Sequence, residues 1–374
     1  MKNIIVIGAG FAGLSAAKKL KNLKGKFDII IIDKKETFDF LPVLPDCIGR
    51  GINPDFLTYN IESLGKDSGF RFIREEVVRL DLEKRQVFGS SLNLEYEYLV
   101  IATGSETNFY GNNNIEENSL KIDDVKDIKR LVDALREGRK SYIISGGGYT
   151  GVEVATNSRL FLDKNKKSGR IIIIERSPSI LGPLPQWMKD YVGSNLKRLN
   201  IEVFTNSAIN RIDGHRVYLS GENIFDDAYV IWAAGVRTAD FIQNLASEKN
   251  PQGRLKVDAS LRLNDRVFVC GDAAYFSYKN NYLRMAVQFA IAQGAHSAQN
   301  IIRSIKGLPL NEYRPVDLGY IIPMANNISC GSIFGFNLRG FIPTVCHFIM
   351  CIYRSCGLRN KAGIVGNLLR RGRR

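Results

Sequence analysis

The chain has 374 residues, of which 45% are hydrophobic and 24% are charged. These values are ordinary for a globular protein and exclude a disordered or fibrous chain. The length suffices for two nucleotide-binding domains and a small additional segment. We expect no N-terminal signal peptide, because an apolar strand starts almost at the first residue. The net charge of +14 is high. Where the positive residues lie along the chain is more informative than their total.

A glycine-rich turn, GAGFAG at residues 8–13, lies between an apolar strand at residues 4–7 and a helix at residues 14–20. Glycines at this spacing allow a tight turn and let the backbone approach a pyrophosphate at the positive end of the helix. A second strand, residues 27–32, ends in Asp33, which is well placed to hold two ribose hydroxyls. Together these features predict a dinucleotide site. Its expected contacts are Gly8, Gly10, Phe11, Ala12, Gly13, Asp33 and Lys34.

A second glycine-rich turn, GGGYTG at residues 146–151, follows a strand at residues 141–145 and opens another helix. The next strand, residues 171–174, ends in Glu175, which would accept hydrogen bonds from a ribose diol and repel a 2′-phosphate. NADH is therefore preferred over NADPH, although the adjacent Arg176 could reduce this preference. The expected contacts are Gly146, Gly148, Tyr149, Thr150, Gly151, Glu175, Ala234 and Gly235.

Two strands that end in small residues, at 96–105 and 228–236, indicate where the chain leaves and re-enters the first domain. Small residues at such turns let the backbone pass close to a cofactor. The sequence therefore predicts an α/β protein with two Rossmann-like dinucleotide-binding domains, the second inserted in the first, and a C-terminal amphipathic helical segment. The expected domains are residues 1–110 with 239–325, residues 111–238, and residues 326–374.

The C-terminal segment is basic and has no acidic residue after Asp317. Its cations are Arg339, Arg354, Arg359, Lys361, Arg370, Arg371, Arg373 and Arg374. The apolar run at 341–353 is too short for a comfortable membrane span. An apolar face flanked by cations suits an interfacial helix on anionic lipid, so we interpret residues 341–370 as a peripheral membrane anchor. A core helix or a homodimer interface is the alternative. The tail lacks any recognised nucleic-acid module, and no nucleic-acid partner is expected.

The six cysteines form neither CxxC pairs nor the dense pattern of a disulfide scaffold. They are Cys47, Cys270, Cys330, Cys346, Cys351 and Cys356. The three histidines, at positions 215, 296 and 347, are also scattered. The sequence therefore predicts no structural metal site and argues against most His-dependent nucleophilic schemes.

Four motifs resemble the two-dinucleotide-binding-domain flavoproteins of the pyridine nucleotide-disulfide oxidoreductase superfamily. They are GAGFAG, ATG at residues 102–104, GGGYTG and CGDAA at residues 270–274, and the resemblance covers about residues 1–320. It implies FAD at the first glycine turn and NADH at the second. It also implies that Asp272 binds the ribityl chain of FAD. The further residues that it adds to the FAD site are Ala102, Thr103, Gly104, Gly271, Ala286 and Val287.

The resemblance leaves the electron acceptor open, and the cysteines discriminate among the relatives. Disulfide reductases need a redox-active cysteine pair, which this sequence lacks. Sulfide:quinone oxidoreductases need one cysteine shortly after the second strand-helix unit and another near the C-terminus, but this chain has no cysteine between Cys47 and Cys270, so the trisulfide chemistry lacks a partner. Coenzyme A disulfide reductases use a single cysteine in the region of Cys47. Here prolines and aliphatic residues replace the small polar residues expected before it.

The remaining resemblance is to the type II NADH:quinone oxidoreductases. Residues 285–294 resemble their AQxAxQ helix start, which faces the flavin and lines the quinone pocket. Gln288 matches the first glutamine, whereas Ala292 takes the place of the second and Gln293 lies one position further on. Glu153, in GGGYTGVE against the family's GGGPTGVE, could orient the nicotinamide ribose or pass protons. Gln288, Glu153 and Gln293 are thus the expected catalytic residues. The alternative interpretations are glutamines in solvent and an acid that merely complements a helix dipole.

The implied function is hydride transfer from NADH to FAD, followed by transfer of two electrons to a membrane quinone. No proton pumping is expected, because no segment spans the bilayer. We expect a peripheral protein on the cytoplasmic side of the cell membrane. The alternatives are a sulfide- or coenzyme A disulfide-linked enzyme, a reductase whose basic tail docks an acidic ferredoxin-like protein, and a flavin-binding redox sensor.

Overall fold

The computed structural model describes residues 1–221, 223–279 and 281–369. The chain divides into two compact units. Unit 1 consists of Met1–Phe38, Tyr59–Glu106 and Val236–Asp317, and unit 2 consists of Asp39–Thr58, Thr107–Gly235 and the described residues from Leu318 onward. Residues 39–58 lie within the first nucleotide domain that the sequence predicts, but in the structure they cluster with unit 2. The chain passes between the units within or next to β3 (Thr37–Asp39), β4 (Thr58–Asn60), β10 (Glu106–Thr107) and β18 (Val236–Arg237).

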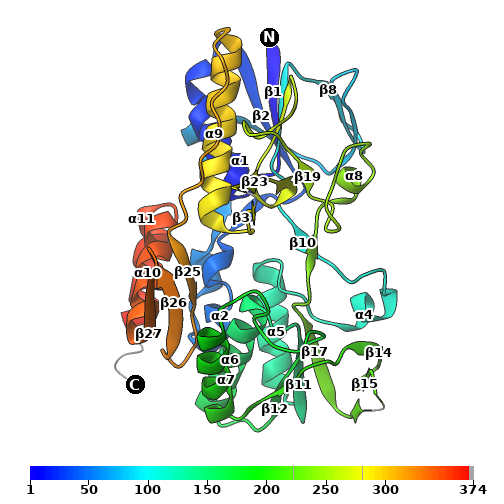
Figure 1. Cartoon of the computed structure of the whole chain (residues 1–374), viewed down its shortest axis with the longest axis vertical. Coiled ribbons are helices and arrows are strands. Elements are labelled where there is room, and N and C mark those ends of the chain that lie inside the picture. The colour runs from blue at the N-terminus through cyan, green and yellow to red at the C-terminus, as the bar shows by residue number, and fades with distance from the viewer. Residues whose placement is uncertain (222, 280, 370–374) are drawn as a thin grey trace. The chain divides into compact units, whose positions relative to one another are not determined.

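Unit 1 is built on a six-stranded sheet with the order β20-β21-β9-β1-β2-β5, in which only the β20–β21 pair is antiparallel. Its strands are β1 (Lys2–Ile7), β2 (Phe27–Asp33), β5 (Arg71–Arg74), β9 (Tyr98–Ile101), β20 (Arg262–Asn264) and β21 (Val267–Val269). The central strands are continuous aliphatic runs because both faces of a parallel sheet are covered. The helices α1 (Phe11–Leu20) and α9 (Val287–Ile305) lie side by side (Figure 1). A Cβ on Gly294 would lie 2.1 Å from the carbonyl oxygen of Ala12, so this glycine permits their close approach.

The other elements of unit 1 are short. An antiparallel sheet of β6 (Val77–Asp81), β7 (Gln86–Gly89) and β8 (Asn93–Glu95) and the helix α8 (Asp240–Gln243) pack their apolar side chains against the large sheet. The remainder are η1 (Lys21–Leu23), α3 (Ile61–Ser68), β19 (Leu255–Lys256), η4 (Gly271–Ala273), β22 (Ala274–Tyr275), β23 (Ser277–Tyr278) and β24 (Asn281–Tyr282).

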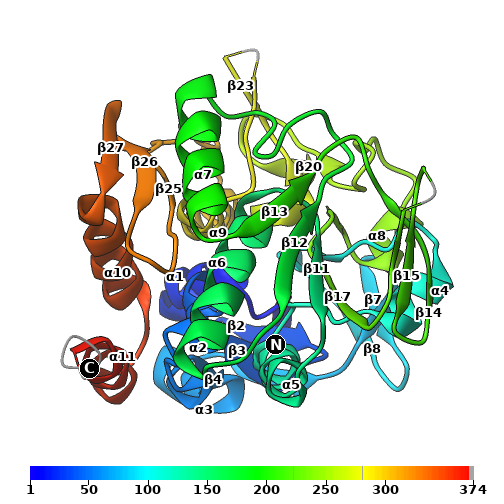
Figure 2. The same cartoon turned by 90° about the horizontal axis from the view of Figure 1, so that it is seen from below.

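Unit 2 contains a four-stranded parallel sheet with the order β13-β12-β11-β17. Its strands are β11 (Ser141–Ser145), β12 (Arg170–Ile174), β13 (Ile201–Phe204) and β17 (Ala228–Trp232). Figure 2 shows α6 (Tyr149–Lys164) and α7 (Gln186–Arg198) on one face and the small antiparallel sheet of β14 (Ile209–Asp213), β15 (Arg216–Leu219) and β16 (Ile224–Phe225) on the other. The remaining elements before residue 318 are η2 (Leu41–Val43), α2 (Asp46–Gly49), η3 (Pro54–Phe56), α4 (Asn113–Asn118) and α5 (Val125–Glu137).

The C-terminal part of unit 2 begins with an antiparallel sheet that the sequence analysis did not predict, formed by β25 (Gly319–Ile322), β26 (Ser329–Ile333) and β27 (Phe336–Gly340). The expected helical segment follows as two helices, α10 (Phe341–Arg354) and α11 (Leu358–Leu369). The helix α10 ends where Ser355 adopts an extended conformation (φ −68°, ψ 155°), and Gly357, with φ of +73°, directly precedes α11. The predicted cations Arg370, Arg371, Arg373 and Arg374 lie outside the described residues.

The α/β class with two Rossmann-like sheets and C-terminal helices is confirmed. Each large sheet has the strand order 3-2-1-4 around its first strand, β1 in unit 1 and β11 in unit 2. In such a sheet the strand order reverses direction at that first strand, and ligands bind at its carboxyl end. Both glycine turns begin there.

Candidate cofactor sites and catalytic residues

The two glycine turns have nearly the same backbone geometry. Gly8 and Gly146 have φ values of +100° and +106°, which disfavour any residue with a Cβ. A Cβ on Gly8 would lie 2.4 Å from the carbonyl oxygen of Ala102, and a Cβ on Gly146 would lie 2.6 Å from that of Ala233. Each turn therefore contacts the segment that follows the neighbouring strand. This close contact explains why both segments consist of small residues.

The other glycines of the turns separate into two kinds. A Cβ on Gly13 would lie 1.8 Å from the oxygen of Gly8, and one on Gly151 would lie 1.9 Å from that of Gly146, so the protein's own packing requires these glycines. Gly10 and Gly148 both have φ of −76° and ψ of −169°, which any residue can adopt. A Cβ at either position would meet no atom within 4 Å. The space in front of them fits the close approach of a dinucleotide pyrophosphate at a helix N-terminus.

The acid at the end of the second strand is held in the same way in both units. Asp33 accepts from the backbone N–H of Ala9 at 2.7 Å and from that of Lys35 at 2.8 Å. Glu175 accepts from the N–H groups of Gly147 and Ser177, each at 2.7 Å. A carboxylate has further lone pairs, so each acid is oriented beside its glycine turn and can still accept from ribose hydroxyls. Arg176 is exposed next to Glu175.

A second cluster of predicted FAD contacts lies at the carboxyl end of β21. Ser105 donates to the Asp272 carboxylate at 2.9 Å, and the guanidinium of Arg254 donates to the Asp272 carbonyl oxygen at 3.0 Å. Burial raises the pKa of Asp272, while Ser105 and Arg254 lower it. Gln293 is 2% exposed, and its side-chain oxygen accepts from the N–H of Gly271 at 2.8 Å. Gln293 thus holds the backbone next to Asp272.

Gln288 lies in the first turn of α9, which begins after Ala286. Its side-chain nitrogen donates to the carboxylate of Asp317 at 3.0 Å, and Asp317 also accepts from Arg284. A carboxylate only accepts hydrogen bonds, so the amide must turn its nitrogen toward Asp317. The N-terminal end of α9 carries a partial positive charge that favours a nearby anion.

Glu153 lies early in α6 within unit 2. Burial raises the pKa of Glu153 to about 8, His347 lowers it and Asp46 raises it. The structure therefore places Glu153 in an electrostatic cluster with two residues from other elements. Neither Asp46 nor His347 is suggested as a partner of Glu153 by the sequence, because both lie far from Glu153 in the chain. The one available signal was a histidine within an apolar helical run.

None of the six cysteines, all of which lie in the described part of the chain, forms a disulfide bond. Cys47 is buried, and its thiol contacts the carbonyl oxygen of Val43 at 3.9 Å. Burial raises the pKa of Cys270 to about 12, which suits a small apolar side chain and not a nucleophile.

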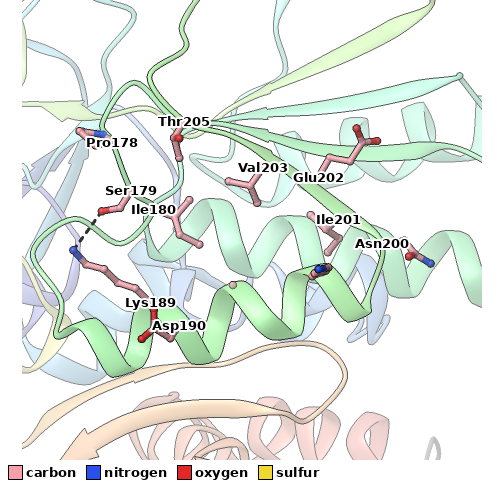
Figure 3. Close-up of a pocket in the computed structure, with 12 residues that line it drawn as sticks. Pro178, Ser179, Ile180, Lys189, Asp190, Asn200, Ile201, Glu202, Val203 and Thr205 are labelled. Atoms are coloured by element: carbon pink, nitrogen blue, oxygen red, sulfur yellow. Dashed lines mark hydrogen bonds between the residues drawn. The ribbon is translucent and has the colours of Figure 1, made fainter.

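A surface pocket of about 680 Å³ lies between α7 and the edge strand β13 of unit 2 (Figure 3). Lys189 donates to Ser179 at 3.3 Å across it. None of the predicted site residues lines this pocket. Ile180, which lines the pocket, also lies beside the second glycine turn: a Cβ on Gly147 would lie 2.6 Å from its side chain.

Comparison with known proteins gives the family. The model of the pyridine nucleotide-disulphide oxidoreductase family matches residues 2–297. The chain belongs to this family. Members of the pyridine nucleotide-disulphide oxidoreductase family are oxidoreductases, in agreement with the two dinucleotide cradles.

Similarity to individual family members extends beyond the region that the family model matches. The chain is 25% identical to a type II NADH:quinone oxidoreductase of Staphylococcus haemolyticus over 91% of each chain. It is 27% identical to a demethylphylloquinone reductase of Synechocystis over 94% of this chain and 91% of the relative. Its fold matches NDH2 from Plasmodium falciparum in complex with NADH, with a TM-score of 0.86, 18% identity and coverage of 99% and 98%.

The two kinds of glycine predict different outcomes for the same substitution. Gly10→Ala should leave the thermal unfolding temperature of the FAD-free protein unchanged but weaken FAD binding at least about tenfold, or about 1.4 kcal/mol. Gly13→Ala should destabilise the FAD-free protein by about 1–3 kcal/mol, because the methyl group overlaps Gly8. Thermal unfolding and flavin titration measure the two effects. Equal FAD affinity in Gly10→Ala and wild type would show that no ligand approaches Gly10.

Proposed function

We propose that the chain oxidises NADH and reduces a quinone, with the balance NADH + H⁺ + quinone → NAD⁺ + quinol. The observation that carries this proposal is the repeated cradle: two glycine turns, each with a ribose-directed acid, in separate units of one chain. Two dinucleotides on one chain suit hydride exchange between them. The full-length similarity to a type II NADH:quinone oxidoreductase and to a demethylphylloquinone reductase supports a quinone as acceptor.

FAD would bind in unit 1 and NADH in unit 2. The FAD contacts are Gly8, Gly10, Phe11, Ala12, Gly13, Asp33, Lys34, Ala102, Thr103, Gly104, Gly271, Asp272, Ala286 and Val287. The NADH contacts are Gly146, Gly148, Tyr149, Thr150, Gly151, Glu175, Ala234 and Gly235. When bound, FAD would supply the two-electron chemistry that links a hydride donor to a quinone. The protein's own part is to hold, orient and protonate.

Three residues would carry the protein's part. Gln288 presents an amide at the positive end of α9, where it can donate to or accept from a polar ring edge. Glu153 holds a proton on its carboxyl group at neutral pH and releases it at alkaline pH. Gln293 acts through Gly271: by fixing that backbone it positions Asp272.

Cysteine chemistry is the main competing mechanism for this family. Cys47 is the cysteine nearest the first acid-ended strand in the sequence, but its buried thiol contacts the Val43 carbonyl oxygen. A disulfide or persulfide mechanism needs an accessible thiolate. The quinone proposal needs no cysteine.

The first test separates these mechanisms. We expect purified protein to oxidise NADH with a soluble quinone. Cys47→Ser should keep at least about half of this rate, a change of under about 0.5 kcal/mol in the barrier, because the proposed reaction uses no thiol. Sulfide and coenzyme A disulfide should not replace NADH and quinone as donor and acceptor. Steady-state assays with each pair measure this. Loss of quinone reduction in Cys47→Ser that retains its FAD would contradict the proposal.

We also propose that the C-terminal segment binds an anionic lipid surface on the cytoplasmic side of the cell membrane. Among the described residues, no helix is long and apolar enough to cross a bilayer. The outer face of α10 nevertheless exposes large apolar side chains: Phe341, Ile342, Val345, Ile349 and Tyr353. The described part of the segment beyond Asp317 carries arginine and lysine but no acid. Such a helix can insert its apolar face among headgroups while its cations meet anionic lipid.

Flotation with vesicles tests the lipid surface. Full-length protein should float with vesicles that contain anionic lipid, and the double variant Ile342→Glu/Ile349→Glu should remain at the bottom of the gradient. Val78→Glu, which changes an exposed apolar residue of unit 1, is the matched control and should float. High salt should lower flotation but not abolish it, because part of the binding is hydrophobic. Wild-type protein that stays at the bottom, as a monomer or as a dimer, would overturn this proposal.

A further inference from the structure

Three helices of unit 2, α2, α6 and α10, bring ionisable side chains together. His347 lies on the inner face of α10, and Asp46 is the first residue of α2. The Nε2 atom of His347 lies 3.9 Å from a carboxylate oxygen of Asp46, and these side chains are 11% and 6% exposed. The other carboxylate oxygen of Asp46 lies 2.8 Å from Nε of Arg50. A buried acid is thus shared between a histidine and an arginine.

The helix α6 brings Glu153 to the same cluster. A Cβ on Gly49 of α2 would lie 2.3 Å from the carbonyl oxygen of Asn157, so α2 and α6 are in backbone contact. Asn157 in turn donates to the carbonyl oxygen of Glu153 at 3.0 Å. Glu153 interacts electrostatically with both Asp46 and His347. Its acid–base behaviour therefore depends on residues of α2 and α10.

The charged and titratable groups that face His347 come from each packed element. They are Asp46 from α2, Arg50 directly after α2, and Glu153 from α6. Within α10, the sulfur of Cys351 on the next turn lies 3.7 Å from Nε2 of His347. Burial lowers the pKa of His347, but Cys351 and Asp46 outweigh burial and raise it well above its ordinary value. The cationic form of His347 is therefore favoured relative to a free imidazole.

We propose that the His347–Asp46 pair sets the protonation of Glu153, so that the C-terminal segment supplies a positioning residue to the nucleotide-binding unit. The inference rests on the proposed function, in which Glu153 handles a proton. Quinol formation takes up one proton beyond the hydride of NADH. The imidazolium of His347 and the carboxylate of Asp46 act on the Glu153 carboxyl in opposite directions, and their balance fixes the pH at which it releases its proton.

The signs of the effects are opposite for the two partners. His347→Gln removes a positive charge, so the pKa of Glu153 should rise. Asp46→Asn removes a negative charge, so the pKa of Glu153 should fall. The same substitution lowers the pKa of His347. His347 then loses its positive charge at high pH and no longer lowers the pKa of Glu153, which limits the fall. An opposite charge near a carboxyl lowers its pKa and a like charge raises it, so the two substitutions should move the pKa of Glu153 in opposite directions.

The test follows two readouts in full-length, FAD-loaded protein. The rate at which a soluble quinone reoxidises NADH-reduced protein is measured across the neutral and alkaline range. Wild type should lose rate as the pH rises through about 8, the pKa of Glu153. The midpoint should move up in His347→Gln, move down in Asp46→Asn, and disappear in Glu153→Gln, which cannot ionise. His215→Gln, which alters an exposed histidine, should keep the wild-type midpoint.

The second readout does not depend on quinone reduction. The chain has only three histidines, so the ring signal lost in His347→Gln assigns His347 in a nuclear magnetic resonance titration of the same protein. His347 should stay protonated above neutral pH in wild type and titrate at lower pH in Asp46→Asn. A normal titration of His347 in wild type, or equal midpoints in all variants, would overturn the inference. Absence of any quinone reduction with the expected histidine titration would instead refute the proposed function alone.

Discussion

In each unit, a close glycine-to-carbonyl contact lies at the carboxyl end of the first strand of the large sheet. In unit 1, Gly8 lies against Ala102 and Gly13 lies against Gly8, and the same contacts recur in unit 2 at Gly146 and Gly151. These contacts force the helix to begin directly behind the strand, so its N-terminal N–H groups face the crevice where the strand order reverses. The positions of Asp33 and Glu175 follow, because each acid is hydrogen-bonded to the same turn. Both proposed cofactor sites therefore depend on glycine at these positions, because a methyl group there would clash with the backbone.

Much of this arrangement could be predicted from the sequence because its determinants are local. A glycine turn, the aliphatic strand before it and the acid after the next strand all lie within a short stretch, and their spacing specifies one βαβ geometry. The family motifs extended that prediction to Asp272 and Gln288. The contact of Gln293 with Gly271 could not be predicted from the sequence. It depends on how α9 packs beside η4, and the pattern of apolar residues in α9 does not specify this packing.

The residues that the sequence did not suggest are those assembled by tertiary packing. Asp46 follows a proline-rich stretch, His347 lies in an apolar helix, and each would pass for an ordinary residue of its element. Only the packing of α2, α6 and α10 brings them to Glu153. The strands β25, β26 and β27 were missed for a related reason: glycines and polar residues interrupt their apolar pattern, and the antiparallel pairing is stabilised by contacts with α10 and α7. The helix α10 thus has two faces with different proposed roles, lipid contact outside and charge balance inside.

The central claim is that electrons pass from NADH to a quinone through one bound flavin and no thiol. Anaerobic rapid mixing of the yellow, FAD-loaded protein tests it most directly. Addition of NADH should bleach the flavin absorbance with a stoichiometry of one NADH per flavin, and subsequent addition of quinone should restore it in a single turnover. Bleaching by sulfide but not by NADH, or a bleached flavin that a ferredoxin restores and quinone does not, would contradict the account.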